Sequence, residues 1–157
     1  MNKQTLKSHF VQGIIGLSVV LALLMPVHAQ SNLHVTAVVP FDFVAGNERL
    51  PAGEYSVFAH TTAQGVLVIR NRDEGTNLVR LTHSTQRPVP TERAMLVFRR
   101  YEDKYFLYQV WTTGEVSGYE LPKSRTERSV ERDLTNARSD RGKAIGVEIV
   151  TITANSQ

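Results

Sequence analysis

The chain has 157 residues, a formal net charge of +3, 41% hydrophobic residues and no cysteine. The lack of cysteine excludes disulfides, thiolate chemistry and a lipoprotein anchor attached through a cysteine. No long run of one charge sign occurs, so the composition gives no support for a nucleic-acid or an anionic-membrane partner.

The first 29 residues have the features of an export signal. Lys3 and Lys7 make a basic start, an apolar run covers residues 11–24, and residues 27–29 are Val-His-Ala. We expect cleavage after Ala29, because small residues occupy the two positions that a signal peptidase reads. The apolar run is shorter than the ~20 residues of a spanning helix, so we expect no membrane span after cleavage.

Removal of residues 1–29 leaves residues 30–157, a length that suits a single domain with its own core. Lys3 and Lys7 leave with the signal, so 16 basic and 15 acidic residues remain and the net charge becomes +1. Export without disulfides is typical of a bacterial envelope. We therefore predict a location in the periplasm or outside the cell.

The first half of this domain reads as strands joined by turns. Period-two alternation and β-branched residues predict strands over residues 33–39, 41–44, 54–60, 66–70 and 78–83. Gly, Asn, Asp and Pro gather in residues 46–53 and 71–77, which we interpret as turns. Residues 84–92 contain two prolines without periodicity and are predicted to form a surface loop.

Residues 94–112 are expected to form the central β-hairpin. They hold the only Trp and three of the five Tyr, and two β-prone runs flank a Glu102-Asp103 loop. This loop places Arg100 opposite Tyr105 and, with regular pairing, Ala94 opposite Trp111. Both faces are apolar near the middle, so we expect the hairpin to be covered on both sides.

One helix is predicted, over about residues 125–137. Ser124 and Glu127 have the spacing of a capping box, in which each side chain satisfies a free amide at the helix start. Val130, Leu134 and Ala137 form a narrow apolar stripe that we expect to cover one face of the central hairpin. The remaining charges are interpreted as a solvated face: Arg125, Glu127, Arg128, Glu131, Arg132 and Asp133.

Two further strands complete the predicted fold. Residues 116–120 are expected to form a weak edge strand. Residues 144–154 are expected to form the last strand, with Ile145, Val147 and Ile149 on one face. The predicted class is mainly β: a single antiparallel β-barrel or β-sandwich with one C-terminal amphipathic helix followed by a final strand. Lipocalin-like barrels also end with a helix and a closing strand.

Three short motifs resemble a group of small exported β-rich proteins of acidobacterial type. They are PFDF at residues 40–43, LPAGEY at 50–55 and KYFL at 104–107, followed by Ser124 and Glu127-Arg128. The resemblance spans most of residues 30–157 and implies export and the β fold. It carries no activity, ligand or site residue. Pro51 and Gly53 suggest a structural role for LPAGEY, because they stiffen and turn the chain into the next strand.

Candidate catalytic and metal-binding residues are few. Three histidines, His34, His60 and His83, would suit zinc if they converged, but their spacing matches no metal motif. Ser84 follows His83 directly, and adjacent strand residues point to opposite faces, so the pair is a poor dyad. Glu54 is the least ordinary carboxylate, with a strand-edge hydrogen-bonding role as the simpler interpretation. The acids at predicted turn tips are interpreted as solvated: Asp73, Glu74, Glu102 and Asp103.

The aromatic–basic cluster has two interpretations. Arg99 and Arg100 lie next to Tyr101, Tyr105 and Tyr108. Stacking and cation attraction could bind a nucleobase or a sugar ring. A cross-strand ladder, in which arginine stems cover the rings, explains the same residues without a ligand and is preferred.

We therefore predict a non-enzymatic exported domain that binds a partner or serves as a structural or adaptor component of the envelope. We assign no catalytic residue, metal or cofactor. A small-ligand carrier with a barrel interior is the alternative, and a hydrolase-type enzyme is third. The partner is left open between an envelope protein and a small apolar or aromatic ligand.

Overall fold

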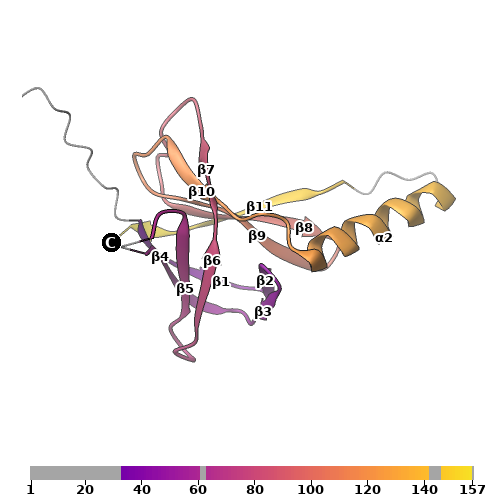
Figure 1. Ribbon diagram of the computed structural model, residues 1–157, viewed down its shortest axis with the longest axis horizontal. Helices are drawn as coiled ribbons and strands as arrows, with labels where there is room; N and C mark the ends of the chain where they lie inside the picture. Colours follow the sequence, from indigo (N-terminus) through magenta and orange to yellow (C-terminus); the bar gives the residue numbers. More distant parts are fainter. Residues whose placement is uncertain (1–32, 61–62, 142–145, 157) are drawn as a thin grey trace, which may run out of the picture. The chain divides into compact units, whose positions relative to one another are not determined.

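The computed structural model describes residues 33–60, 63–141 and 146–156, the side chains of 137–141 excepted (Figure 1). The predicted signal over residues 1–29 and its cleavage point lie outside them. The described part is mainly β, as predicted, with two sheets and one helix, α2 (Arg125–Arg141). The helix precedes the strand β11, also as predicted.

The first sheet has five strands in the order β12–β1–β4–β5–β6, and all neighbours are antiparallel. The predicted alternation along β4 is confirmed, since Tyr55 and Val57 are fully buried in the core while Phe58 faces the other side. The strands are β1 (His34–Val39), β4 (Gly53–Ala59), β5 (Val66–Asn71), β6 (Asn77–Leu81) and β12 (Asn155–Ser156).

The second sheet has seven strands. Its main order is β11–β8–β9–β10–β7, while β2 pairs with β9 and β3 pairs with β2. The β2–β9 pair is parallel, which the prediction of an antiparallel fold did not include. The strands are β2 (Phe43–Ala45), β3 (Glu48–Leu50), β7 (His83–Gln86), β8 (Met95–Tyr101), β9 (Lys104–Trp111), β10 (Ser117–Glu120) and β11 (Glu148–Thr153).

Four chain segments pass from one sheet to the other, and two of them consist of a single residue. Thr82 alone separates β6 from β7, and Ala154 alone separates β11 from β12. Thr82 is held at this corner because its amide and its hydroxyl both donate to the Gly65 carbonyl, at 2.7 and 2.9 Å. The prediction of a loop over residues 84–92 is wrong for its first residues, which belong to β7. The prediction of an edge strand at residues 116–120 is also wrong, because β10 lies between β7 and β9.

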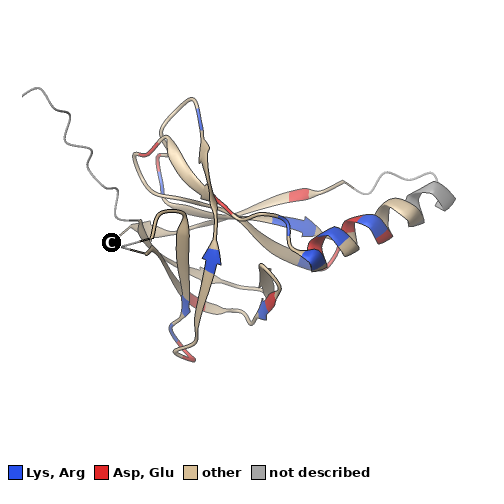
Figure 2. Ribbon diagram, in the orientation of Figure 1, with Lys and Arg blue, Asp and Glu red and all other residues tan. Residues whose placement is uncertain are grey.

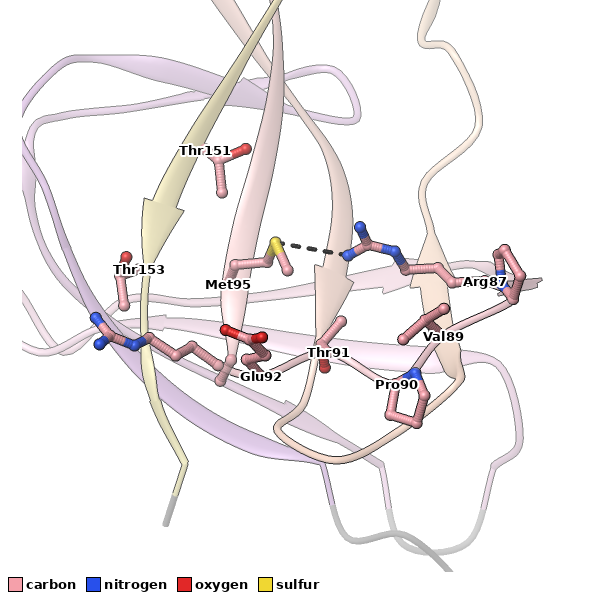
Figure 3. Close-up of a pocket in the computed structure, with 11 residues that line it drawn as sticks. Arg87, Val89, Pro90, Thr91, Glu92, Met95, Thr151 and Thr153 are labelled. Atoms are coloured by element: carbon pink, nitrogen blue, oxygen red, sulfur yellow. Dashed lines mark hydrogen bonds between the residues drawn. The ribbon is translucent and has the colours of Figure 1, made fainter.

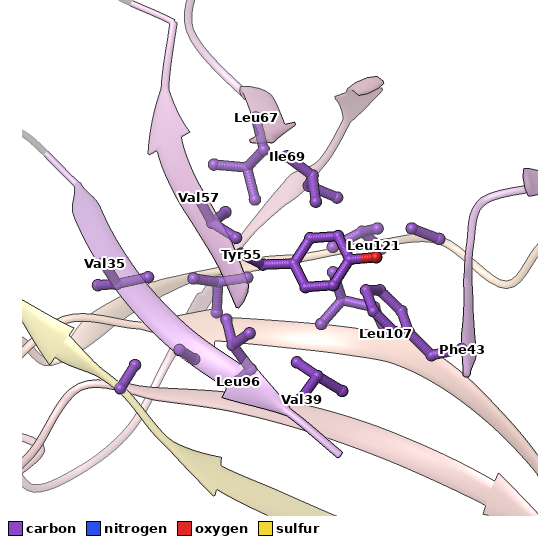
Figure 4. Close-up of a cluster of buried hydrophobic side chains, with 14 of the residues drawn as sticks. Val35, Val39, Phe43, Tyr55, Val57, Leu67, Ile69, Leu96, Leu107 and Leu121 are labelled. Atoms are coloured by element: carbon purple, nitrogen blue, oxygen red, sulfur yellow. The ribbon is translucent and has the colours of Figure 1, made fainter. Parts of the chain in front are cut away.

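Side chains from both sheets fill the space between them (Figure 4). Phe43 packs edge-to-face on Tyr55 and on Phe98, with ring centroids 5.0 and 5.3 Å apart. Tyr55 donates a 2.7 Å hydrogen bond to the Pro51 carbonyl, which ties the LPAGEY segment to the core. The largest fully buried side chains are Tyr55, Phe43, Phe98, Phe106, Leu67, Ile69, Leu96, Val35, Val39, Val57 and Val110.

The central hairpin, β8–β9, has the predicted two-residue loop. Arg100 pairs with Tyr105 and Phe98 with Leu107, as predicted. A β-bulge at Tyr108 then shifts the register by one residue, so that Met95, and not Ala94, lies opposite Trp111. The bulge re-aims all β9 side chains beyond it. Both faces of the hairpin carry buried side chains, as expected.

The helix α2 begins at the predicted residue but covers less of the hairpin than predicted. The Glu127 amide donates to the Ser124 hydroxyl at 3.0 Å, which is one half of the capping box. Within the described residues, hydrogen bonds made by Arg125 and Glu127 in its first turn join α2 to the strand-bearing part, and α2 has no extended contact with any strand. Val130 and Leu134 remain half-exposed, and the side chain of Ala137 lies outside the described set.

The strand β11 has the predicted alternation of faces. Val150 and Ile152 pack against the core, while Val147 and Ile149 are exposed. Ile145 lies outside the described residues. The periodicity did not say which face of the strand meets the core, and the structure shows that the face with Val147 and Ile149 is the outer one.

Candidate binding surface

The outward face of the first sheet carries an apolar surface. Register places Phe58, Val68 and Val79 side by side across β4, β5 and β6, and it places Val66 beside Leu81 in the next row. Leu81 is 74% exposed and Val79 is 55% exposed, whereas Val68 between its neighbours is buried. We call these five residues the apolar surface.

A polar row borders the apolar surface on one side. Thr36, Ser56, Arg70 and Asn77 follow one another across β1, β4, β5 and β6. The Arg70 guanidinium donates to the Asn77 amide oxygen at 2.7 Å and lies 5.5 Å from the centre of the Phe58 ring. The buried Thr36 hydroxyl has no hydrogen-bond partner. An apolar centre beside polar groups is typical of a surface that binds another protein.

Phe58 is held in place at the β1 end of its row. Its ring meets the His34 ring edge-on, with centroids 5.9 Å apart, and His34 Nε2 lies 2.9 Å from the Ser56 hydroxyl. A fixed aromatic side chain loses little conformational entropy when a partner covers it. The position of Phe58 on the apolar surface is therefore fixed by its neighbours.

The aromatic–basic cluster forms the cross-strand ladder that was preferred. The Arg99 guanidinium lies 3.5 Å from the centre of the Tyr108 ring, and that of Arg100 lies 5.4 Å from Tyr105. Arg99 also forms an ion pair with Glu127 at 3.0 Å, and the Tyr101 hydroxyl donates to the same carboxylate oxygen at 3.1 Å. Glu127 is thus buried, and the prediction of a solvated residue is wrong for it.

Burial and the charge of Glu127 set the protonation of this cluster. Burial, followed by the negative charge of Glu127, raises the pKa of Tyr101 well above its ordinary value of 10.0. Burial acts to lower the pKa of the Arg99 guanidinium, but the hydrogen bond to Glu127 and its charge outweigh it, so the pKa is raised. The cluster therefore contains the Arg99–Glu127 ion pair and the neutral Tyr101 phenol. These contacts join the first turn of α2 to β8.

The other candidate residues occupy structural positions. Glu54 forms an ion pair with Arg72 at 2.7 Å, which fits the interpretation of Glu54 as a strand-edge hydrogen-bonding residue. Asp73 accepts the Glu54 amide at 3.2 Å, and Ser84 and His83 pair with Tyr119 and Glu120 of β10. The remaining predicted turn acids are exposed: Glu74, Glu102 and Asp103.

The three histidines do not converge. His34 contacts Ser56 and Phe58, His60 follows β4, and His83 begins β7 in the other sheet. In the part of the chain that the structure describes, no group of three His, Asp or Glu side chains is arranged to hold a metal ion. No described helix is long and apolar enough to cross a membrane.

Of the hollows at the surface, two border strands. One, of about 550 Å³, is an open groove beside residues 87–95 into which Thr151 and Thr153 of β11 project (Figure 3). Arg87 reaches across its floor, and its guanidinium lies 4.0 Å from the Met95 sulfur. The other, of about 310 Å³, lies between β2, the β8–β9 turn and the start of α2. Opposite charges, Asp42 with Arg49 and Asp103 with Lys104, line the second hollow.

Comparison with protein-family models, with curated proteins and with solved structures finds no match for this chain. The geometry of the described residues is that of a β domain whose two sheets share a core of buried side chains and whose first sheet has an apolar outward face.

Sequence reasoning missed the apolar surface. The residues of this surface on β5 and β6 were interpreted only as members of short strands, and the strand at residues 66–70 was predicted to be buried. These residues are Val66, Val68, Val79 and Leu81. The signal that could have found the surface is that β5 is apolar on both faces, while the strand that follows it, β6, has an apolar residue at each of its positions 78, 79 and 81.

Proposed function

We propose that this chain is a non-enzymatic exported domain that binds a protein partner, in an adaptor or structural role at the bacterial envelope. The apolar surface carries the proposal. Large contiguous apolar patches are uncommon on monomeric proteins and usually mark contact sites. A protein partner suits this surface better than a small ligand, because the surface is a sheet face and not a pocket.

The architecture supports the same role. We infer a sandwich of two open sheets that share one core and are joined where the chain crosses at Thr82 and Ala154. The side chains of Tyr55, Phe43 and Phe98 occupy its interior. A carrier would need that volume for its ligand, so the carrier alternative is less favoured.

Native mass spectrometry of the protein, purified gently from the exporting cell, tests the proposal. We expect a partner protein to remain bound, and we expect it to be lost from the double variant Val79→Lys, Leu81→Lys. Both residues are exposed, so the substitutions leave the core intact. The matched control is Val89→Lys, which changes a residue that is 68% exposed outside the apolar surface and should retain the partner.

Three results would contradict the proposal. A small adduct that is released on unfolding would favour the carrier. A bare monomer from the exporting cell would leave the apolar surface without a partner. A partner that both the double variant and the Val89→Lys control retain would be bound elsewhere on the domain.

A further inference from the structure

The strand β11 has one edge that pairs with no other strand among the described residues. It is the last strand in the order of its sheet, and it pairs with β8 alone. Five of its six residues are β-branched, it contains no Pro or Lys, and its pairing with β8 runs without a bulge. Soluble proteins usually protect such edges with charges, prolines, bulges or very short strands, because a free edge pairs with other chains.

The other described sheet edges do carry protection. β12 has two residues and β3 has three, of which Glu48 and Arg49 are charged. At β6, the Arg80 side chain donates to the Ala45 carbonyl at 2.9 Å and forms an ion pair with Glu48 at 2.9 Å. β7 is a short polar strand. β11 therefore stands apart within the described residues.

Exposed apolar side chains lie along the free part of this edge. Ile149 is 55% exposed and Val147 is 44% exposed. The C-terminal end of β11 contacts β1 and continues into β12, so the accessible stretch is residues 147–151. This stretch is long enough to add one strand to the sheet.

We propose that a second copy of this chain pairs antiparallel with β11, with a two-fold axis at Ile149. Ile149 then meets its own copy, Val147 faces Thr151, and Glu148 faces Val150. The seven-stranded sheet continues from one copy into the other, and the same edge serves both copies, as two-fold symmetry requires. This inference does not rest on the proposed function, since β11 belongs to the other sheet.

Charge placement favours a second copy in this orientation. Glu148 is the only charged residue of β11, and Arg100 already neutralises it at 3.0 Å. Antiparallel pairing sets each Glu148 opposite an apolar residue, whereas in-register parallel pairing would set the two acids side by side, which is destabilising. The paired stretch is short compared with a standard interface, so the dimer is expected to dissociate on dilution.

Sedimentation of the purified protein over a concentration series tests the dimer. We expect the mass to double as concentration rises, and we expect Ile149→Lys to abolish this change because it places a charge at the axis. Val79→Lys is the matched control, because Val79 is also 55% exposed but lies in the other sheet, and it should dimerise like the parent chain. A monomer at every concentration, or a dimer unaffected by Ile149→Lys, would overturn the proposal.

Disulfide trapping tests the register, because the chain has no cysteine of its own. Residues directly opposite in antiparallel strands have Cα atoms about 4.5–5.5 Å apart, a separation that a disulfide can bridge. Ile149→Cys should therefore form a covalent dimer on mild oxidation. Val147→Cys is similarly exposed but faces Thr151 of the other copy, and should not. Equal trapping of the two variants would show that the proposed pairing is wrong.

Discussion

Glu127 is the charged residue with the least exposure among those described, and it joins two distant parts of the chain. Its carboxylate lies between Arg99 and Tyr101 of β8, while its amide completes the first turn of α2. The side chains of Arg99 and Glu127 are 13% and 4% exposed. The pair is thus shielded from water, and loss of one charge leaves the other without compensation.

Replacement of Glu127 by Gln should lower the free energy of unfolding by about 3 kcal/mol, because the Arg99 charge stays buried without a counter-charge. Urea unfolding followed by the fluorescence of Trp111 measures the change. Glu131→Gln is the control. It breaks the Lys123–Glu131 ion pair, whose side chains are both more than a third exposed, and should cost less than about 1 kcal/mol. Equal effects of the two variants would contradict a special role for Glu127.

Two buried tyrosines and one partly buried tyrosine should make the fold sensitive to alkali. Burial raises the pKa of Tyr55, Tyr101 and Tyr119, and Glu127 adds to the effect at Tyr101. Above the ordinary value of 10.0, the unfolded chain loses these protons while the folded chain keeps them. The stabilisation is therefore complete below about pH 10 and is lost as the pH rises beyond it.

Urea midpoints measured from about pH 8 to about pH 11 should fall steeply only in the upper part of this range. Tyr101→Phe should make that fall shallower, since it removes one of the three raised pKa values. It should also cost about 1 kcal/mol at neutral pH through the lost hydrogen bond to Glu127. A fall that is as steep in Tyr101→Phe as in the parent chain would show that Tyr101 does not contribute.

Residue-level roles were predictable from the sequence where they are local. The Ser124 cap was found because its partner lies three residues away. The carboxylate of Glu127 was assigned to solvent because its real partner, Arg99, lies 28 residues away on another element. A capping-box pattern cannot distinguish a Glu that turns back to the cap from one that reaches a neighbouring strand.

At the scale of elements, the β8–β9 hairpin shows where pairing rules hold and where they fail. The loop fixed the pairs nearest to it, because loop length determines register. Glu102 in this loop has a φ of 55°, and the Arg100 side chain donates to its carbonyl at 2.7 Å. No residue type marks the bulge at Tyr108, so the predicted pairs beyond it were wrong by one position.

The strand β10 approaches β9 closely at Gly118. Gly118 of β10 lies over Trp111, and a Cβ atom at Gly118 would come within 2.6 Å of the indole ring. Trp111 cannot easily move, since its ring nitrogen donates to Gln109 at 3.2 Å and Arg87 lies 5.1 Å from the ring centre. Glycine is therefore required at 118 for packing.

Gly118→Ala should lower the free energy of unfolding by about 2 kcal/mol, through overpacking against the ring. It should also shift the fluorescence of Trp111, the single tryptophan. Gly146→Ala is the matched control, because a Cβ there meets no atom within 4 Å and the backbone φ is not positive. An unchanged stability and spectrum in Gly118→Ala would mean that β10 lies further from the ring than the structure places it.

The helix α2 is the remaining element whose features can be compared with the prediction. Basic and acidic residues alternate along α2 (Figure 2), and Lys123 bonds Glu131 at 2.6 Å. The helix start and composition were predictable from local signals. Its limited contact with the hairpin was not, because an apolar stripe indicates that a helix packs but not how much of its length does so.

At the scale of the whole molecule, the two sheets share one core and are joined by four crossings of the chain. The mainly β class, the single helix and the final strand were predictable from periodicity and turn residues. The corners at Thr82 and Ala154 were not, because a single residue outside a strand resembles ordinary continuation of that strand. Because side chains of both sheets pack in the same core, we expect the two sheets to unfold together.

Leu67→Ala tests this cooperativity from the sheet that lacks tryptophan. Leu67 lies on β5 with no exposed surface, in a core that also contains Leu96 and Leu107 of the other sheet. Its truncation should cost about 3 kcal/mol. Trp111 in the second sheet should report the same lowered urea midpoint as circular dichroism does, since a two-state transition gives coincident curves. The control Val116→Ala changes an exposed side chain and should leave both curves unmoved. If circular dichroism shifts while the Trp111 curve does not, the sheets unfold separately and the shared core does not couple them.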